Sequence, residues 1–148
     1  MPKFIKQRDD KSCVPLALLN LFNVYGRSYT YADLSWMAEL VDCNQHGTVV
    51  DKSSAFHEFL ISNFKVRRLG KIGVTEKRCA THLAKGKVML ASHQMYKTHG
   101  GYHLFLVTEY DGDLFTCVNY KRSPRKHTAK LSWQELEAKR TLNVWLID

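Results

Sequence analysis

The 148-residue sequence predicts an α+β fold in which a helical N-terminal half precedes an antiparallel β-sheet. Before Gly86, a long apolar run and several helix-capping signals predict helices. After Gly86, short runs that read as strands alternate with turn signals. Helices followed by a block of strands are typical of α+β proteins. The length is that of one domain, so we expect residues 1–148 to form a single domain.

The first predicted helix covers residues 13–25, which read CVPLALLNLFNVY. This run is almost entirely apolar, which indicates a largely buried helix, and Gly26 is a typical helix stop. Pro15 fits only in a first helical turn, so the helix must begin close to Cys13.

Capping pairs and hydrophobic patterns predict the remaining elements. Before Gly86 these are a helix from Thr30 and Asp33 to about residue 41, a helix from Thr48 and Asp51 to about residue 63, a strand over 65–69 and a helix over 75–85. After Gly86 they are strands over 87–95, 102–109 and 113–119, a short helix capped by Ser132 and Glu135, and a strand over 142–147.

The cysteine pattern argues against disulfides and zinc. The four cysteines lie far apart and form no C-x-x-C pair. The N-terminus does not resemble a signal peptide, and no apolar run approaches the roughly 20 residues that span a bilayer. We therefore expect a cytoplasmic chain with reduced thiols, no membrane span and no metal or organic cofactor.

The formal net charge of +8 is the unusual bulk property. The basic residues include two clusters, Lys65, Arg67, Arg68 and Lys71, and Lys121, Arg122, Arg125 and Lys126. We interpret both as solvated surface, because the interleaving of aromatic residues that is typical of nucleic-acid sites is weak here. Nucleic acid is therefore not the expected partner, although the second cluster leaves a basic adaptor as an alternative.

Cys13 is the candidate nucleophile. The reactive form of cysteine is the thiolate, and a helix N-terminus lowers a thiol pKa through its exposed N–H groups and its dipole. Cys13 begins the apolar helix and follows a polar segment, whereas the other three cysteines lie in a loop, a helix or a strand. Gln7 stands six residues upstream, where a side-chain amide can join the nucleophile's own N–H in stabilising an oxyanion.

His103 is the candidate base. It opens an apolar strand directly after the turn formed by Gly100 and Gly101. His93 and His99 lie in the same region and remain alternatives.

The predicted hairpin after His103 indicates which residue could orient the His103 imidazole. A three-residue loop with glycine in the left-handed position would place Asn119 opposite His103, where its amide can fix the imidazole tautomer. A two-residue loop would place Tyr120 there instead.

The order Gln7, Cys13, His103, Asn119 resembles the papain-like cysteine peptidases. The chain resembles most the bacteriocin-processing domains that remove double-glycine leaders and usually sit on ABC exporters. The resemblance covers nearly the whole chain, through the segments QRDDKSCVPLALLNLF, YGRSYTYADL, HGTVVDKSSAFHEFL, YHLFLVTEYDGDLFTCVNY and LSWQELEAKRTLNVWLI.

The resemblance implies a papain-like fold, with the nucleophile helix packed on the C-terminal sheet. It also implies roles for four residues: Gln7 as oxyanion donor, Cys13 as nucleophile, His103 as base and Asn119 as orienting residue. The family usually has aspartate at the last of these positions. No transporter segment follows, so a free-standing enzyme is expected.

These observations predict a thiol-dependent hydrolase that cleaves a peptide or amide bond, with a Gly-Gly leader peptide among its candidate substrates. Other acyl transfers, such as deamidation or amide ligation, would use the same residues. The alternative is a catalytically dormant peptidase fold that binds a peptide or protein partner.

Overall fold

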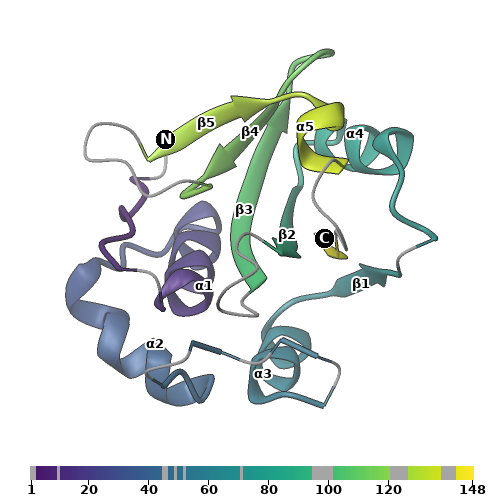
Figure 1. The fold of residues 1–148 in the computed structure, drawn as a ribbon. Helices are drawn as coiled ribbons and strands as arrows, with labels where there is room; N and C mark the ends of the chain where they lie inside the picture. The colour runs from purple at the N-terminus through teal and green to yellow at the C-terminus, as the bar shows by residue number, and fades with distance from the viewer. Residues whose placement is uncertain are drawn as a thin grey trace.

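Helices come first along the chain and most strands come last, as the α+β prediction required (Figure 1). The structure is a computed structural model that describes residues 3–9, 11–44, 47–48, 50–51, 53–70, 72–94, 102–120, 127–137 and 143–148. The helices are α1 (Cys13–Val24), the 3₁₀ turn η1 (Tyr31–Asp33), α2 (Leu34–Leu40), α3 (Ala55–Asn63), α4 (Glu76–Ala84) and α5 (Trp133–Glu137). The strands are β1 (Val66–Leu69), β2 (Val88–Gln94), β3 (Tyr102–Tyr110), β4 (Phe115–Val118), β5 (Thr128–Leu131) and β6 (Asn143–Ile147).

The described strands form one antiparallel sheet of six, in the order β1-β6-β2-β3-β4-β5. Strand β1 comes from the helical half and joins the sheet by pairing with the C-terminal β6, so that Val66 lies opposite Ile147. Strand β3 lies inside the sheet between β2 and β4. The start of β3, where the candidate base lies, pairs with β2, with His93 opposite His103, and the pairing with β4 begins at Leu106.

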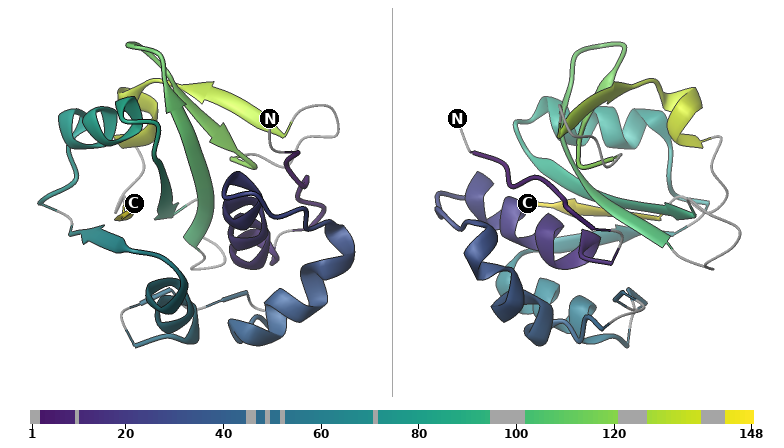
Figure 2. Two further views of the ribbon diagram at one scale, coloured as in Figure 1. Left: turned by 180° about the vertical axis from the view of Figure 1, so that it is seen from behind. Right: turned by 60° about the vertical axis from the view of Figure 1, so that its left-hand side comes forward.

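Helices cover both faces of this sheet (Figure 2). Successive residues of a strand point to opposite faces. On β3, Leu104 and Leu106 pack in a core cluster with residues of α1, α2 and α3. Phe105 and Val107 belong to a second cluster, with residues of α4 and α5. The sheet is therefore buried on both sides, with α1 on the face that carries Leu104.

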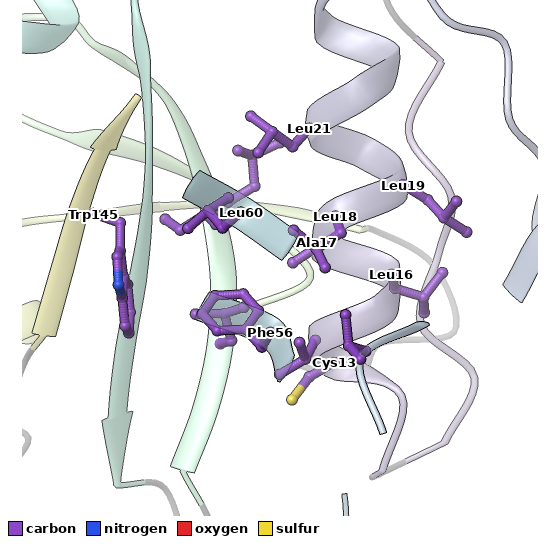
Figure 3. Packing of buried hydrophobic residues seen from close by; sticks show 14 of the residues in the cluster. Cys13, Leu16, Ala17, Leu18, Leu19, Leu21, Phe56, Leu60 and Trp145 are labelled. Carbon is purple, nitrogen blue, oxygen red and sulfur yellow. The ribbon is translucent and has the colours of Figure 1, made fainter. Parts of the chain in front are cut away.

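Helix α1 is buried along nearly its whole length. Ten of its 12 residues are buried, which confirms the prediction made from its continuous apolar sequence. Figure 3 shows leucines on opposite sides of the helix, with Leu18 and Leu21 on the side of Trp145. The predicted stop is confirmed as well, because Gly26 adopts a φ of 96° and donates its N–H to the carbonyl of Asn23.

Two of the three predicted capping pairs are confirmed. Thr30 and Asp33 form a reciprocal capping box, which opens η1 and leads directly into α2. Ser132 and Glu135 make the equivalent bonds at the start of α5.

The third capping pair, Thr48 with Asp51, is wrong. The third helix starts at Ala55, where the Ser54 hydroxyl accepts the N–H of His57 at 3.2 Å. The Asp51 carboxylate instead accepts the N–H and hydroxyl of Ser53, which forms a local turn before the helix.

Strand β5 was not predicted from the sequence. Its four residues TAKL form an edge strand with mostly exposed or half-buried side chains, and they pair with β4. Such a short segment with a single buried apolar residue, Leu131, carries almost no periodic signal.

We expect Leu18→Ala to destabilise the fold by about 2–5 kcal/mol, because it leaves a cavity in a fully buried position of α1. Urea unfolding followed by circular dichroism would measure the change. Ile72→Ala is the control, since Ile72 is 98% exposed and its removal should change the free energy of unfolding by less than about 0.5 kcal/mol. Equal effects of the two substitutions would contradict the described packing of α1.

Candidate active site

The candidate nucleophile lies where the helical half meets the sheet. Cys13 is the first residue of α1 and is only 8% exposed (Figure 3). The backbone of Leu104, the residue that follows His103 on β3, lies close enough to the thiol to lower its pKa. The packing of α1 on the sheet thus brings Cys13 close to Leu104, whereas the ring of His103, the preceding residue, stacks on Phe105, which belongs to the cluster on the other face of the sheet.

A turn built by Asp9 precedes the nucleophile helix. The Asp9 carboxylate accepts the N–H groups of Lys11 and Ser12 at 2.9 and 2.8 Å and the Ser12 hydroxyl at 2.9 Å. Burial opposes the negative charge, but these hydrogen bonds outweigh it and lower the Asp9 pKa. The Ser12 side chain makes no capping bond to α1, because its hydroxyl is engaged with Asp9.

Burial dominates the electrostatics of Cys13. Removal from solvent raises the pKa of its thiol to about 11, from 9.0. The backbone N–H groups of Leu104, Val14 and Cys13 itself oppose this effect and lower the pKa, as the helix start predicted. They are outweighed, so the expected lowered pKa is wrong and the thiol of the described state is neutral at pH 7.

His103 is held by a backbone carbonyl. Its Nε2 lies 2.7 Å from the carbonyl oxygen of Asn119. A carbonyl oxygen can only accept a hydrogen bond, so Nε2 must carry the proton. In the neutral ring the lone pair is then on Nδ1, which is the atom able to take a proton. The ring also stacks on Phe105, at 5.9 Å between centroids.

Both predicted registers of the β3–β4 hairpin are wrong. Tyr110 pairs with Phe115 across a four-residue loop, in which the Asp111 side chain accepts two backbone N–H groups. An irregularity between Val107 and Glu109 then shifts the pairing by one residue. Neither Asn119 nor Tyr120 is therefore placed opposite His103 in the way that the simple loops predicted.

Asn119 reaches His103 because the chain turns as β4 ends. Asn119 has a φ of 58°, in the left-handed region, and its N–H donates to the carbonyl of His127. This conformation directs its carbonyl to the imidazole. Its side-chain amide bonds to the N-terminal segment, accepting the Gln7 N–H at 3.0 Å and donating to the Ile5 carbonyl at 2.8 Å.

Gln7 is buried beside this amide, with 5% of its surface exposed. Its Nε2 donates to the carbonyl of Asp9 at 2.6 Å. A primary amide has two N–H groups, and this bond uses one of them. Its Oε1 is buried and has no hydrogen-bond partner among the residues that the structure describes. The turn that begins α1 therefore also holds the candidate oxyanion donor.

The remaining cysteines do not contribute to this arrangement. Cys79 and Cys117 are fully buried in the cluster on the opposite face of the sheet, and burial raises the pKa of both thiols. Cys43 is half-buried and lies close to the nucleophile turn, with its sulfur 3.4 Å from the Lys11 carbonyl. Within the described ranges, no three Cys, His, Asp or Glu side chains come together as metal ligands.

Two candidates named from the sequence lie outside the described residues. One is the alternative base His99, and the other is the second basic cluster, which consists of Lys121, Arg122, Arg125 and Lys126. The backbone of His93 pairs with that of His103 across β2 and β3.

Sequence reasoning missed Asn20 and Asp9. Asn20 is fully buried in α1 and bonds to both backbone groups of Ile5. The available signal was an amide inside the apolar run CVPLALLNLFNVY, because a buried polar side chain needs a partner. For Asp9 the signal was the spacing Asp-x-x-Ser before the helix, which is typical of a local side-chain turn.

No family model matches the sequence, and no curated protein matches it. Solved structures do match. The peptidase domain of ComA from Streptococcus, described as a bifunctional ABC transporter in a quorum-sensing pathway, is 16% identical over 99% of this chain and 98% of that chain, with a TM-score of 0.72. The ComA peptidase domain of Streptococcus mutans is 14% identical over 97% and 98%, with a TM-score of 0.56. A C39-like peptidase from Bacillus anthracis is 11% identical over 99% and 94%, with a TM-score of 0.60.

These matches show the fold. The chain has the α+β architecture of C39 peptidase domains, which is the papain-like fold that the sequence resemblance implied. Each match covers nearly the whole of both chains, so the likeness includes the helical half and the sheet together. None of the helices in the described ranges is long and apolar enough to cross a membrane.

A pKa of about 11 predicts how Cys13 reacts with iodoacetamide. At pH 8 only roughly 0.1% of such a thiol is ionised, against roughly 10% at a pKa of 9.0, and the thiolate is the reacting form. Labelling should therefore rise about tenfold per pH unit from pH 8 until it levels off near pH 11. Mass spectrometry of the Cys13 peptide would follow it, with urea-denatured protein as control. A labelling rate that already levels off below pH 8 would contradict the conclusion that burial raises the pKa of Cys13.

Proposed function

We propose that this chain is a cysteine peptidase that cleaves a peptide bond, with Cys13 as nucleophile, His103 as base, Asn119 as orienting residue and Gln7 as oxyanion donor. The observation that carries the proposal is the bond from His103 Nε2 to the Asn119 carbonyl. In the neutral imidazole this bond assigns the basic lone pair to Nδ1, and His103 directly precedes Leu104, whose backbone lowers the pKa of the Cys13 thiol. Thiol-dependent acyl transfer needs such a base close to its nucleophile.

The first half of the reaction forms an acyl-enzyme. Nδ1 of His103 takes the proton from Cys13 as the sulfur attacks the carbonyl carbon of the scissile peptide bond. Negative charge develops on the carbonyl oxygen, where the second N–H of Gln7 Nε2 and the backbone N–H of Cys13 can donate to it. The imidazolium then gives its proton to the leaving amine, the C–N bond breaks and a thioester remains on Cys13.

The second half restores the enzyme. His103 takes a proton from water, and the resulting nucleophile attacks the thioester carbonyl. The C–S bond breaks, the carboxylic acid product leaves, and Cys13 regains its proton. Asn119 acts throughout by keeping Nε2–H in a hydrogen bond, which keeps the lone pair at Nδ1.

The raised pKa of Cys13 supports general-base activation over a preformed ion pair. With a pKa of about 11, the thiol is neutral before substrate binds. The proton then moves to His103 as attack takes place, when the oxyanion donors can stabilise the new charge.

A peptide is the substrate class that the similar folds support. The matching structures are peptidase domains, two of them from ComA. The sequence resemblance to the bacteriocin-processing domains makes a leader peptide ending in Gly-Gly the first candidate to test.

A dormant binding module is the second candidate, and two observations favour it. The thiol is neutral and buried, and one N–H of the Gln7 amide is engaged with Asp9. Such a module would keep the peptidase fold and bind a peptide without cleaving it. Measured turnover of a peptide decides between the two functions.

Cys13→Ala should abolish cleavage of a fluorogenic peptide in which Gly-Gly is linked to aminomethylcoumarin, because no other residue supplies the attacking sulfur. The fold should persist, as the change removes one buried sulfur atom. Cys43→Ala is the matched control and should keep activity within about threefold. Equal turnover by wild type and Cys13→Ala would refute the assignment, and binding of the same peptide without any turnover would favour the binding module.

His103→Ala should lower kcat by about 10²–10⁴-fold, the usual contribution of general acid–base catalysis. Stopped-flow or steady-state fluorescence with the same peptide would measure it. His82→Ala is the comparison, because the buried His82 bonds to the Val88 carbonyl and lies outside the proposed site. Activity retained after the loss of His103 would assign the base to His93 or His99.

A further inference from the structure

The N-terminal segment that carries Gln7 is held by two asparagine side chains. Asn20 accepts the N–H of Ile5 at 2.7 Å and donates to the carbonyl of the same residue at 3.1 Å. Asn119 donates to that carbonyl at 2.8 Å and accepts the N–H of Gln7 at 3.0 Å. Residues 3–8 belong to no helix or strand, so these side chains replace the partners that secondary structure would provide.

Asn20 is suited to hold this segment in register with the nucleophile. It lies seven residues after Cys13 on the same helix, which is two turns along nearly the same face. It is 0% exposed, so its amide is surrounded by packed side chains and has little freedom to move. The position of Ile5 is therefore defined relative to the helix that also presents Cys13.

The side chain of Gln7 begins two residues after this contact. Its backbone N–H is tied to Asn119, and its amide is tied to the carbonyl of Asp9. An oxyanion donor must sit about 2.7–3.1 Å from the oxygen that develops charge, so small shifts in its backbone reduce its effect strongly. The bonds made by Asn20 thus limit where the Gln7 amide can be.

We propose that Asn20 is a positioning residue for the oxyanion donor Gln7, acting through its two hydrogen bonds to Ile5. The inference rests on the proposed function, since it assigns Asn20 to the same peptidase site. Asn20 does not touch the reacting atoms; it fixes the segment from which Gln7 reaches them.

Asn23 provides a matched control within the same helix. It is also buried, at 6% exposed, and its amide also bonds to both backbone groups of one residue, in this case Tyr29. Its remaining contact is to the carbonyl of Lys3 at 3.5 Å, so it makes no bond to residues 5–7. A general loss of helix packing should therefore affect Asn20 and Asn23 variants alike, whereas loss of the Gln7 position should affect only the former.

The first experiment compares Asn20→Leu with Asn23→Leu. Leucine keeps the approximate volume and removes the amide. Amide hydrogen exchange followed by NMR should show faster exchange at Ile5 in Asn20→Leu and at Tyr29 in Asn23→Leu, because each loses the acceptor of its N–H. Unchanged exchange at Ile5 would overturn the proposal without reference to any activity.

The kinetic readout uses the Gly-Gly aminomethylcoumarin peptide. Asn20→Leu should lower kcat at least tenfold with little change in KM, whereas Asn23→Leu should stay within about threefold of wild type. Iodoacetamide labelling of Cys13 needs the thiolate but no oxyanion donor, so its rate should stay within twofold in both variants. An equal loss of kcat in the two variants would overturn the positioning role.

A double-mutant cycle with Gln7→Ala tests whether Asn20 acts through Gln7. Gln7→Ala should itself cost about 10²–10³-fold in kcat. If the proposal holds, adding Asn20→Leu to Gln7→Ala lowers kcat by less than twofold further. A full additional tenfold loss would overturn it. If Asn20→Leu fails to fold, Asn20→Ala replaces it, because water can occupy the vacated amide position.

A wild-type protein that does not cleave the peptide refutes the proposed function and the positioning role that depends on it. A wild type that cleaves the peptide, with Asn20→Leu as active as Asn23→Leu, refutes only the role of Asn20.

Discussion

The packing of α1 against β3 is the contact on which the rest of the structure depends. An α-helix that is apolar on all sides must be covered on all sides, so α1 needs the sheet on one face and other segments on the remaining ones. The sheet supplies Leu104 and Leu106, and Met37 of α2 packs in the same cluster. The packing of α1 therefore joins the helical half to the strands. It also buries the start of α1 together with the rest of the helix.

The same burial creates the polar contacts of the site. Asn20 and Asn23 are buried with α1, and a buried amide is costly unless its groups are hydrogen-bonded. Both amides find backbone partners in segments without regular structure, around Ile5 and Tyr29. The apolar helix thus organises the N-terminal segment, and with it Gln7, through its few polar residues.

Burial also decides the charge state of the candidate site. The backbone N–H groups around Cys13 favour a thiolate, yet removal from water has the larger effect and the pKa rises to about 11. On the proposed mechanism, a neutral thiol avoids the cost of burying a negative charge at Cys13 before substrate is present. On this mechanism the bond from His103 to the Asn119 carbonyl has the main effect on the base, because it selects Nδ1 as the ring nitrogen that takes the proton.

Local signals predicted most of the helices and strands and the candidate site residues. The continuous apolar run predicted α1, Gly26 predicted its end, and the Thr30–Asp33 and Ser132–Glu135 pairs predicted two helix starts, because each of these depends on neighbouring residues only. The contacts of Gln7, Cys13, His103 and Asn119 could not be predicted in the same way. The hairpin register depended on a side-chain turn at Asp111 and an irregularity before Glu109, and the cap of α3 is made by Ser54 while Asp51 bonds to Ser53.

The sequence by itself therefore determined the α+β order of elements, the buried helix and the residue types from which a thiol-dependent site could be built. Only the tertiary structure decided that the carbonyl of Asn119 holds His103 while its amide holds Gln7 and Ile5. It also decided that Cys13 is neutral. The physical reason is that helix periodicity and caps are short-range, whereas burial and long-range hydrogen bonds depend on which distant segments the packing of α1 brings together.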